Sequence, residues 1–227
     1  MIIIKICGIS TIDTAVAARD AGADLIGFVF AASRRQIAVE KARDIACQVS
    51  GIGKVGVFVN APLAEVQSIA RECRLDYVQL HGDESPAYCR LIGYPVIKAF
   101  GISPGFSAAA FAGYQPGWTL FDSFSVGQQG GTGIPFDWQQ ALSVIRQVPR
   151  PFMVAGGLTP GNVVEAIQIL APDGVDVSGG VETNGVKDSK KIERFITAVR
   201  SMEVADVKQN CSSNQTSGSV NEKGHPA

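Results

Sequence analysis

The sequence predicts a single (β/α)8 barrel, because short apolar runs alternate with longer helical segments along most of the chain. The runs begin about 25 residues apart, roughly the length of one strand with its crossover helix. They are rich in β-branched residues and apolar throughout, as is typical of strands buried on both faces. A chain of 227 residues suits such a barrel, which commonly needs ~200–250.

Each element can be placed in order. The predicted strands span residues 2–6, 24–30, 54–59, 76–80, 95–100, 119–122, 152–155 and 175–178. Helical spacing of the apolar residues between them predicts helices over residues 11–21, 39–49, 63–73, 85–92, 136–145, 160–170 and 190–199. The remaining gap predicts a further helix around residues 106–112, which is rich in alanine but interrupted by glycines. An open doubly wound sheet is the alternative, but it usually carries Gly-x-Gly-x-x-Gly where this chain has Cys7-Gly8-Ile9-Ser10.

The composition limits the function classes. Lys and Arg number 20 against 21 Asp and Glu, so the chain has no basic excess for nucleic acid or an anionic membrane. Two histidines, and five cysteines without C-x-x-C spacing, predict neither a metal site nor a disulfide framework. Without a signal peptide or a long apolar stretch, we expect a cytoplasmic protein.

Residues 1–202 form the predicted barrel domain, and residues 203–227 differ from it in composition. The final segment has no aromatic residue, Leu or Ile and is rich in Ser, Asn and Gln. Such a segment buries too little apolar area to offset its ordering entropy, so we expect a disordered polar tail.

The active site of such a barrel lies at the carboxyl ends of the strands. Gly156-Gly157 and Gly179-Gly180 end two consecutive predicted strands, where glycine lets backbone N–H groups approach a phosphate closely. The other chemically capable residues at strand ends are Cys7, Arg34, Arg35, His81, Asp122 and Asp176. From the residues alone, Cys7 could equally be a small buried hydrophobe and Asp122 a capping carboxylate.

Several strand-end motifs, taken in order, resemble the phosphoribosylanthranilate isomerase family of tryptophan biosynthesis. They include KICGIS at 5–10, VQLHGDE at 78–84, GGTGIPFDW at 130–138, AGGLTPGNV at 155–163 and GVDVSGGVE at 174–182. The resemblance implies an Amadori rearrangement of N-(5-phosphoribosyl)anthranilate to 1-(2-carboxyphenylamino)-1-deoxyribulose 5-phosphate. It implies a small phosphorylated aminosugar as the substrate and no cofactor or metal. We expect the protein to be a monomer.

The resemblance also implies the roles of individual residues. Cys7 would be the general base and Asp122 the general acid. Arg35 would hold the substrate carboxylate through its planar fork of donors, and Asp176 the sugar hydroxyls or the anilinic nitrogen. The chain has Ser33-Arg34-Arg35 where the family tends to have Ser-Pro-Arg, so Arg34 competes with Arg35. The phosphate would bind at Gly156, Gly157, Gly179 and Gly180.

Two other readings compete with this one. A catalytically silent barrel could bind a sugar phosphate, but it would need neither Cys7 nor Asp122. A histidine-pathway aminoaldose isomerase would typically use carboxylates at the ends of strands one and six, whereas strand one ends here in Cys7. We also expect His81 to brace a loop and the glycine-rich segment 127–133 to close over the substrate.

Overall fold

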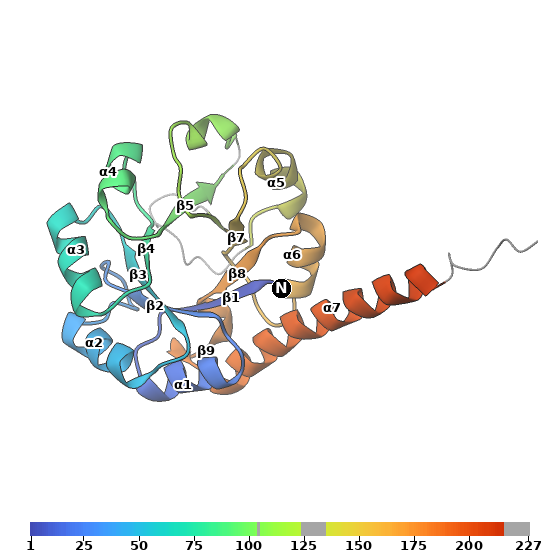
Figure 1. The fold of residues 1–227 in the computed structure, drawn as a ribbon, viewed down its shortest axis with the longest axis horizontal. Helices are drawn as coiled ribbons and strands as arrows, with labels where there is room; N and C mark the ends of the chain where they lie inside the picture. The colour runs from blue at the N-terminus through green and yellow to red at the C-terminus, as the bar shows by residue number, and fades with distance from the viewer. Residues whose placement is uncertain (104, 124–134, 216–227) are drawn as a thin grey trace, which may run out of the picture.

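The computed structural model describes residues 1–103, 105–123 and 135–215, with residues 204–215 described by their backbone alone. Eight parallel strands close into a barrel in chain order, and the last strand hydrogen-bonds to the first (Figure 1). The predicted barrel is confirmed. The strands are β1 (Ile3–Cys7), β2 (Leu25–Val29), β3 (Gly53–Phe58), β4 (Tyr77–Leu80), β5 (Val96–Ile102), β6 (Trp118–Ser123), β7 (Phe152–Val154) and β8 (Gly174–Val177).

The helices form a ring outside the barrel (Figure 1). Capping side chains mark where two of the helices begin. Ser85 accepts a hydrogen bond from the Tyr88 N–H, and Pro86 is the first residue of that helix. Asp137 accepts a hydrogen bond from the Gln140 N–H at the start of the other. The helices are α1 (Ile12–Asp20), α2 (Val39–Gln48), α3 (Leu63–Glu72), α4 (Pro86–Leu91), α5 (Trp138–Ile145), α6 (Val163–Leu170) and α7 (Ser189–Gln215).

Successive side chains of each strand point to opposite faces of the sheet, so one core lies inside the barrel and another lies between the strands and the helices. On β1, Ile4 and Ile6 face outward and join the large core between strands and helices. Ile3 and Cys7 belong to smaller clusters inside the barrel, with partners such as Leu25 and Val57. Lys5, which has the same parity as Ile3 and Cys7, is therefore on the inner face.

The segment between β5 and β6 differs from the other crossovers. Only a short 3-10 helix, η1 (Ala108–Phe111), stands where we expected a helix over 106–112. Glycines and Pro116 limit helix length here, and aromatic packing covers the strands instead. The Phe111 ring lies 4.6 Å from the Phe100 ring and 5.7 Å from the Phe121 ring, centroid to centroid.

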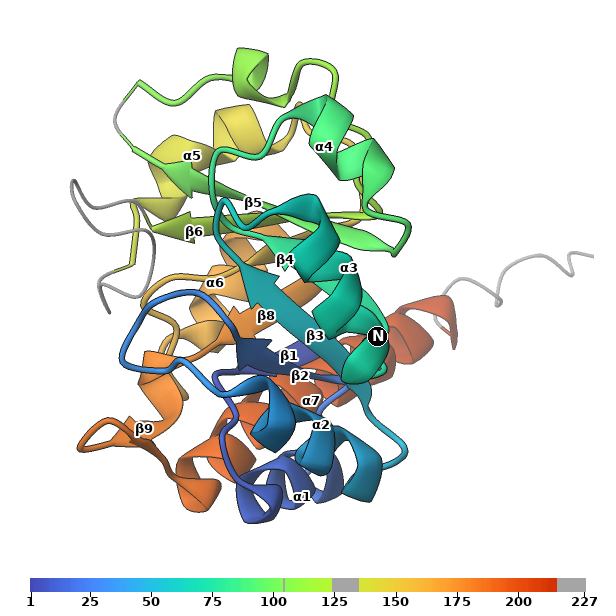
Figure 2. The ribbon, with the colours of Figure 1, turned by 90° about the vertical axis from the view of Figure 1, so that its left-hand side faces the viewer.

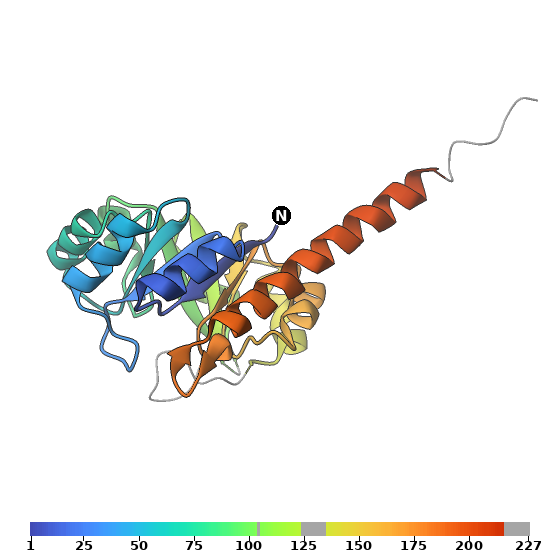
Figure 3. The ribbon, with the colours of Figure 1, turned by 90° about the horizontal axis from the view of Figure 1, so that it is seen from below.

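The last helix also differs from its predicted bounds. We expected a helix to end at Val199 and the tail to begin at Glu203, whereas α7 continues to Gln215 and projects beyond the barrel (Figure 3). Neither glycine nor proline occurs between Ser189 and Gln215, so nothing in the backbone chemistry stops the helix there. Residues 216–227 lie outside the described part. None of the described helices is long and apolar enough to cross a membrane.

A small hairpin follows β8 and was not predicted. It consists of a 3-10 turn, η2 (Gly179–Val181), and two short antiparallel strands, β9 (Glu182–Thr183) and β10 (Val186–Lys187). Figure 2 shows that β1, β5 and β6 point toward the side where β9 lies, while the end of α7 leaves on the opposite side. The hairpin therefore borders the carboxyl face of the barrel, where the site residues were predicted.

Candidate active site

Cys7 is the last residue of β1, and its side chain packs inside the barrel against Val29 and Val57. It is buried, with 7% of its surface exposed. Gly27 on β2 leaves room for it, because a Cβ at Gly27 would lie 3.0 Å from Cys7 Sγ and 3.1 Å from Lys5 Nζ. The thiol and the Lys5 ammonium thus share the space over one glycine.

Lys5 was not singled out in the sequence, and the structure buries it completely. Its Nζ donates a hydrogen bond to Asp176 Oδ1 at 3.0 Å and lies beside the Cys7 sulfur, over Gly27. Burial works to lower the pKa of Lys5, but Asp176 and Cys7 outweigh burial and raise that pKa above its usual value. Lys5 is therefore a cation at neutral pH, and Asp176 has one oxygen committed to it.

The electrostatics of Cys7 are dominated by burial, which raises the pKa of its thiol. The Lys5 ammonium and Lys187 oppose that rise, and the Asp176 carboxylate adds to it. Because the pKa stays above its usual value, Cys7 is mainly a thiol at neutral pH.

Asp122 lies near the end of β6 and is held at both carboxylate oxygens. Oδ1 accepts a hydrogen bond from the Ser123 N–H at 2.7 Å, and Oδ2 lies 3.3 Å from His81 Nε2. The other imidazole nitrogen of His81 lies 3.0 Å from Gln79 Nε2. We expected His81 to brace a loop, but its side chain instead contacts the predicted acid.

Arg35 and Arg34 both donate hydrogen bonds to Glu182, a residue for which the sequence predicted no role. Arg35 forms a bidentate pair, Nε to Oε1 at 2.6 Å and Nη2 to Oε2 at 3.1 Å. Arg34 donates once to Oε2, at 3.0 Å. Lys187 Nζ completes the cluster at 2.7 Å from Oε1. The Arg35 side chain is largely buried and that of Arg34 mostly exposed, at 13% and 60%.

Glu182 is consequently ionised well into the acid range. Burial raises the pKa of its carboxyl, but hydrogen bonds from Arg35 and Lys187 outweigh burial and lower that pKa below its usual value. Burial lowers the pKa of Lys187, and the partnership with Glu182 only partly offsets this effect.

The two glycine pairs lie in loops that touch each other. Gly156 adopts a φ of +77°, and a Cβ there would lie 2.4 Å from the Ser123 N and 2.7 Å from Asp122 Oδ1. A Cβ on Gly180 would lie 1.8 Å from the Leu158 carbonyl oxygen, so this approach admits only glycine. The loops after β7 and β8 therefore meet beside Asp122.

Comparison with known proteins identifies the family of the chain. The family described as "N-(5'phosphoribosyl)anthranilate (PRA) isomerase" matches residues 4–198. The chain belongs to this family. It is 49% identical to the N-(5'-phosphoribosyl)anthranilate isomerase of Desulforudis audaxviator over 203 residues, covering 88% of this chain and 98% of that protein. For the enzyme of Moorella thermoacetica, identity is 43% over 216 residues, with coverages of 94% and 96%.

Solved structures of the isomerase family have the same fold. The phosphoribosyl anthranilate isomerase of Thermus thermophilus gives a TM-score of 0.80 at 33% identity, covering 88% of this chain and all of that one. A relative in complex with reduced 1-(o-carboxyphenylamino)-1-deoxyribulose 5-phosphate gives 0.75 at 34% identity, with the same coverages. The predicted family and isomerase activity are confirmed.

The sequence contains a signal for the hairpin of β9 and β10. Asn184-Gly185 between two short apolar-polar runs is the usual two-residue turn of a hairpin. Both residues have positive φ, at +52° and +79°. The turn places Lys187 opposite Glu182 in the ladder, which explains their ion pair.

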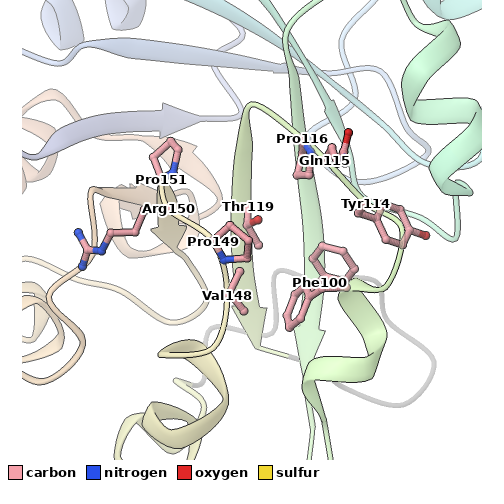
Figure 4. Close-up of a pocket in the computed structure, with 10 residues that line it drawn as sticks. Phe100, Tyr114, Gln115, Pro116, Thr119, Val148, Pro149, Arg150 and Pro151 are labelled. Atoms are coloured by element: carbon pink, nitrogen blue, oxygen red, sulfur yellow. The ribbon is translucent and has the colours of Figure 1, made fainter.

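A pocket on the outside of the barrel is separate from the isomerase residues. It has a volume of about 270 Å³ and lies beside the crossover that lacks a full helix (Figure 4). Phe100 and Tyr114 face prolines 149 and 151 across it. No predicted site residue lines this pocket.

The segment 127–133, predicted to close over the substrate, lies outside the described residues. Within the described chain, no group of His, Cys, Asp and Glu is arranged to hold a metal.

Proposed function

We propose that Cys7 and Asp122 carry out the two proton transfers by which this isomerase converts N-(5'-phosphoribosyl)anthranilate into 1-(2-carboxyphenylamino)-1-deoxyribulose 5-phosphate. Asp122 protonates the furanose ring oxygen as its bond to C1 breaks, leaving an iminium ion. The Cys7 thiolate then takes the proton from C2, giving an enolamine that tautomerises to the ketone. Only protons and the electrons of existing bonds move, so the rearrangement is balanced without an external oxidant or reductant.

The observation that carries the proposal is the placement of one acid and one base inside the same barrel mouth. Cys7 ends β1, Asp122 lies at the end of β6, and both are on the inner face. These strands are not neighbours in the barrel, so a substrate bound between them would present different atoms to the two groups.

Gln79 and His81 support an acid role for Asp122. When the Gln79 amide donates to His81 Nδ1, the imidazole proton lies on Nε2 and faces the carboxylate. Gln79 Oε1 is buried and lacks a hydrogen-bond partner among the described residues. Turning the amide lets Oε1 accept a hydrogen bond from Nδ1–H, and Nε2 can then accept a hydrogen bond from the O–H of a neutral Asp122 carboxyl. The same two side chains thus suit both protonation states.

The remaining contacts suit the two anionic ends of the substrate. The guanidinium of Arg35 has five N–H donors and uses two on Glu182, which leaves donors for the anthranilate carboxylate. Gly156, Gly157, Gly179 and Gly180 offer backbone N–H groups to the phosphate. The assignment of Asp176 to a substrate hydroxyl or the anilinic nitrogen stays a prediction, with Lys5 already bound to one of its oxygens.

Steady-state kinetics with phosphoribosylanthranilate, followed by loss of its fluorescence, tests the acid and the base. Cys7→Ser and Asp122→Asn should each lower kcat by at least ~10²-fold with little change in KM. Cys47→Ser is the matched control, because Cys47 is exposed and lies in α2. Wild-type turnover by either site variant would refute that residue's role.

The cytoplasmic location and the monomeric state also stay predictions. Light scattering of the purified protein would test the monomeric state.

A further inference from the structure

Lys5 is a charged group in a place where charges are costly. Its side chain is fully buried among the inward-facing residues of the barrel, and transferring an ammonium ion out of water costs several kcal/mol unless it finds partners. A barrel interior is ordinarily filled by branched apolar side chains. Leu25, Val55 and Ile97 supply such side chains in the neighbouring inner layer. An ammonium ion at this place calls for a chemical reason.

The contacts of Lys5 identify that reason. Its ammonium lies 3.0 Å from Asp176 Oδ1 and beside the Cys7 sulfur. Gly27 provides the space, since any Cβ there would press on both Nζ and Sγ. A cation that only had to neutralise Asp176 would not need to lie beside the thiol.

We propose that Lys5 is a positioning residue that stabilises the thiolate of Cys7 and so makes Cys7 competent as the base, with Asp176 holding the ammonium in place. The inference rests on the proposed function, in which Cys7 removes the C2 proton. It adds a residue that does not itself meet the substrate.

Three charged groups act on Cys7 from the surrounding strands. They are Lys5 on β1, Asp176 on β8 and Lys187 on β10. Lys187 is the weaker candidate for stabilising the thiolate, because its ammonium donates to Glu182 and to Ser178 and lowers the pKa of Cys7 less than Lys5 does. Lys5 is shared between one carboxylate and the sulfur, so thiolate formation leaves this buried trio with a net negative charge. Burial first, and then this charge balance, explain why the resting state is mainly thiol and why losing Lys5 would remove the base.

Alkylation of Cys7 by iodoacetamide, measured against pH with the Cys7 peptide resolved by mass spectrometry, tests the electrostatics without substrate. Lys5→Met should slow alkylation at neutral pH by at least ~10-fold and move its pH dependence upward, because an opposite charge nearby is lost. Lys5→Arg keeps a cation and should stay nearer to wild type. Asp176→Asn keeps an oxygen that can accept from Lys5 but removes the negative charge that raises the pKa of Cys7, so it should speed alkylation. A purely structural role for the trio would not shift the two single variants in opposite directions.

Thiolate absorbance in the ultraviolet, taken as wild type minus Cys7→Ser, provides the same titration without a reagent. An unchanged Cys7 titration in Lys5→Met would overturn the proposal, even if Cys7→Ser remained inactive and thereby upheld the proposed function. Conversely, full activity of Cys7→Ser would remove the base role while leaving the titration shift intact. If Lys5→Met fails to fold, as judged by circular dichroism, Asp176→Asn decides: unchanged or slower alkylation in that variant would also overturn the proposal.

Discussion

Arg35 and Arg34 are adjacent in sequence but are held in very different ways. The Arg35 guanidinium is largely buried and is fixed by two hydrogen bonds to Glu182, whereas Arg34 is exposed and makes one. A fixed planar guanidinium loses less entropy when it binds a carboxylate than a solvated one does. The geometry therefore favours Arg35 as the group that recognises the substrate carboxylate.

Arg35→Ala should raise KM by roughly 10–100-fold, because a hydrogen bond to a charged group contributes ~1.5–3 kcal/mol. Arg34→Ala serves as the matched control and should change KM by less than a few fold. Steady-state kinetics of both variants gives the comparison. Equal effects, or a larger effect at Arg34, would transfer the carboxylate contact to Arg34.

The pH dependence of turnover should reflect the raised pKa of Cys7. Burial raises that pKa, so the fraction of thiolate grows as pH rises through neutrality. In Asp122→Asn, where no proton on residue 122 limits the rate, the residual kcat/KM should therefore increase about tenfold per pH unit below the Cys7 pKa. Measuring kcat/KM of that variant from about pH 6 to pH 9 tests this behaviour. A flat profile of Asp122→Asn over that interval would be incompatible with a titrating thiol base.

The elements that could be predicted from sequence are those whose pattern repeats. Each strand shows a run of apolar, β-branched residues, and each was placed within two residues of its observed bounds. The short helix η1 was overestimated because glycines and packing of Phe111 determine that segment rather than alanine content. The contacts of Lys5 with Asp176, and of Arg35 with Glu182, join residues far apart in sequence. Such contacts depend on barrel closure, which no local pattern contains.

The turn of the hairpin formed by β9 and β10 leads to a prediction about substrate binding. Gly185 has a φ of +79°, which a β-branched side chain adopts only at a cost of ~1–3 kcal/mol. Gly185→Val should therefore disturb the Glu182–Lys187 pairing and raise KM in the same direction as Arg35→Ala. Asn184→Gly is the control, since glycine tolerates the φ of +52° at the neighbouring position. Unaltered KM in Gly185→Val would separate the hairpin from substrate binding.

On the scale of the whole molecule, the first residues of the chain are held against α7. Arg200 donates to the Ile2 carbonyl at 2.7 Å and to Asp24 Oδ2 at 2.7 Å. Glu203 accepts from the Ile2 N–H and from Arg200. Residues 203–227 contain no aromatic residue, Leu or Ile, so they offer little apolar surface to pack, and we expect the barrel to be stable without the residues after Glu203.

Ending the chain after Glu203 should leave the melting temperature within a few degrees of the full chain. Glu203→Ala in the full chain should lower stability by about 1 kcal/mol, the upper range for partly exposed ion pairs. Glu193→Ala, at an exposed position of α7, is the matched control and should have a smaller effect. Thermal unfolding followed by circular dichroism measures all three. A large loss of stability on truncation would mean that residues beyond Glu203 pack on the barrel.

The pairing of β1 with β8, which closes the barrel, has a consequence for the synthesis of the protein. Lys5 and Cys7 leave the ribosome first, but Asp176, the carboxylate that pairs with Lys5, is made near the end of the barrel. During translation the ammonium must stay in water, because no counterion yet exists to accompany it into an apolar interior. The first strand therefore cannot settle in its final place until the eighth has emerged. Barrel closure and formation of the Lys5–Asp176 pair beside Cys7 are therefore a single late event in the folding of the nascent chain.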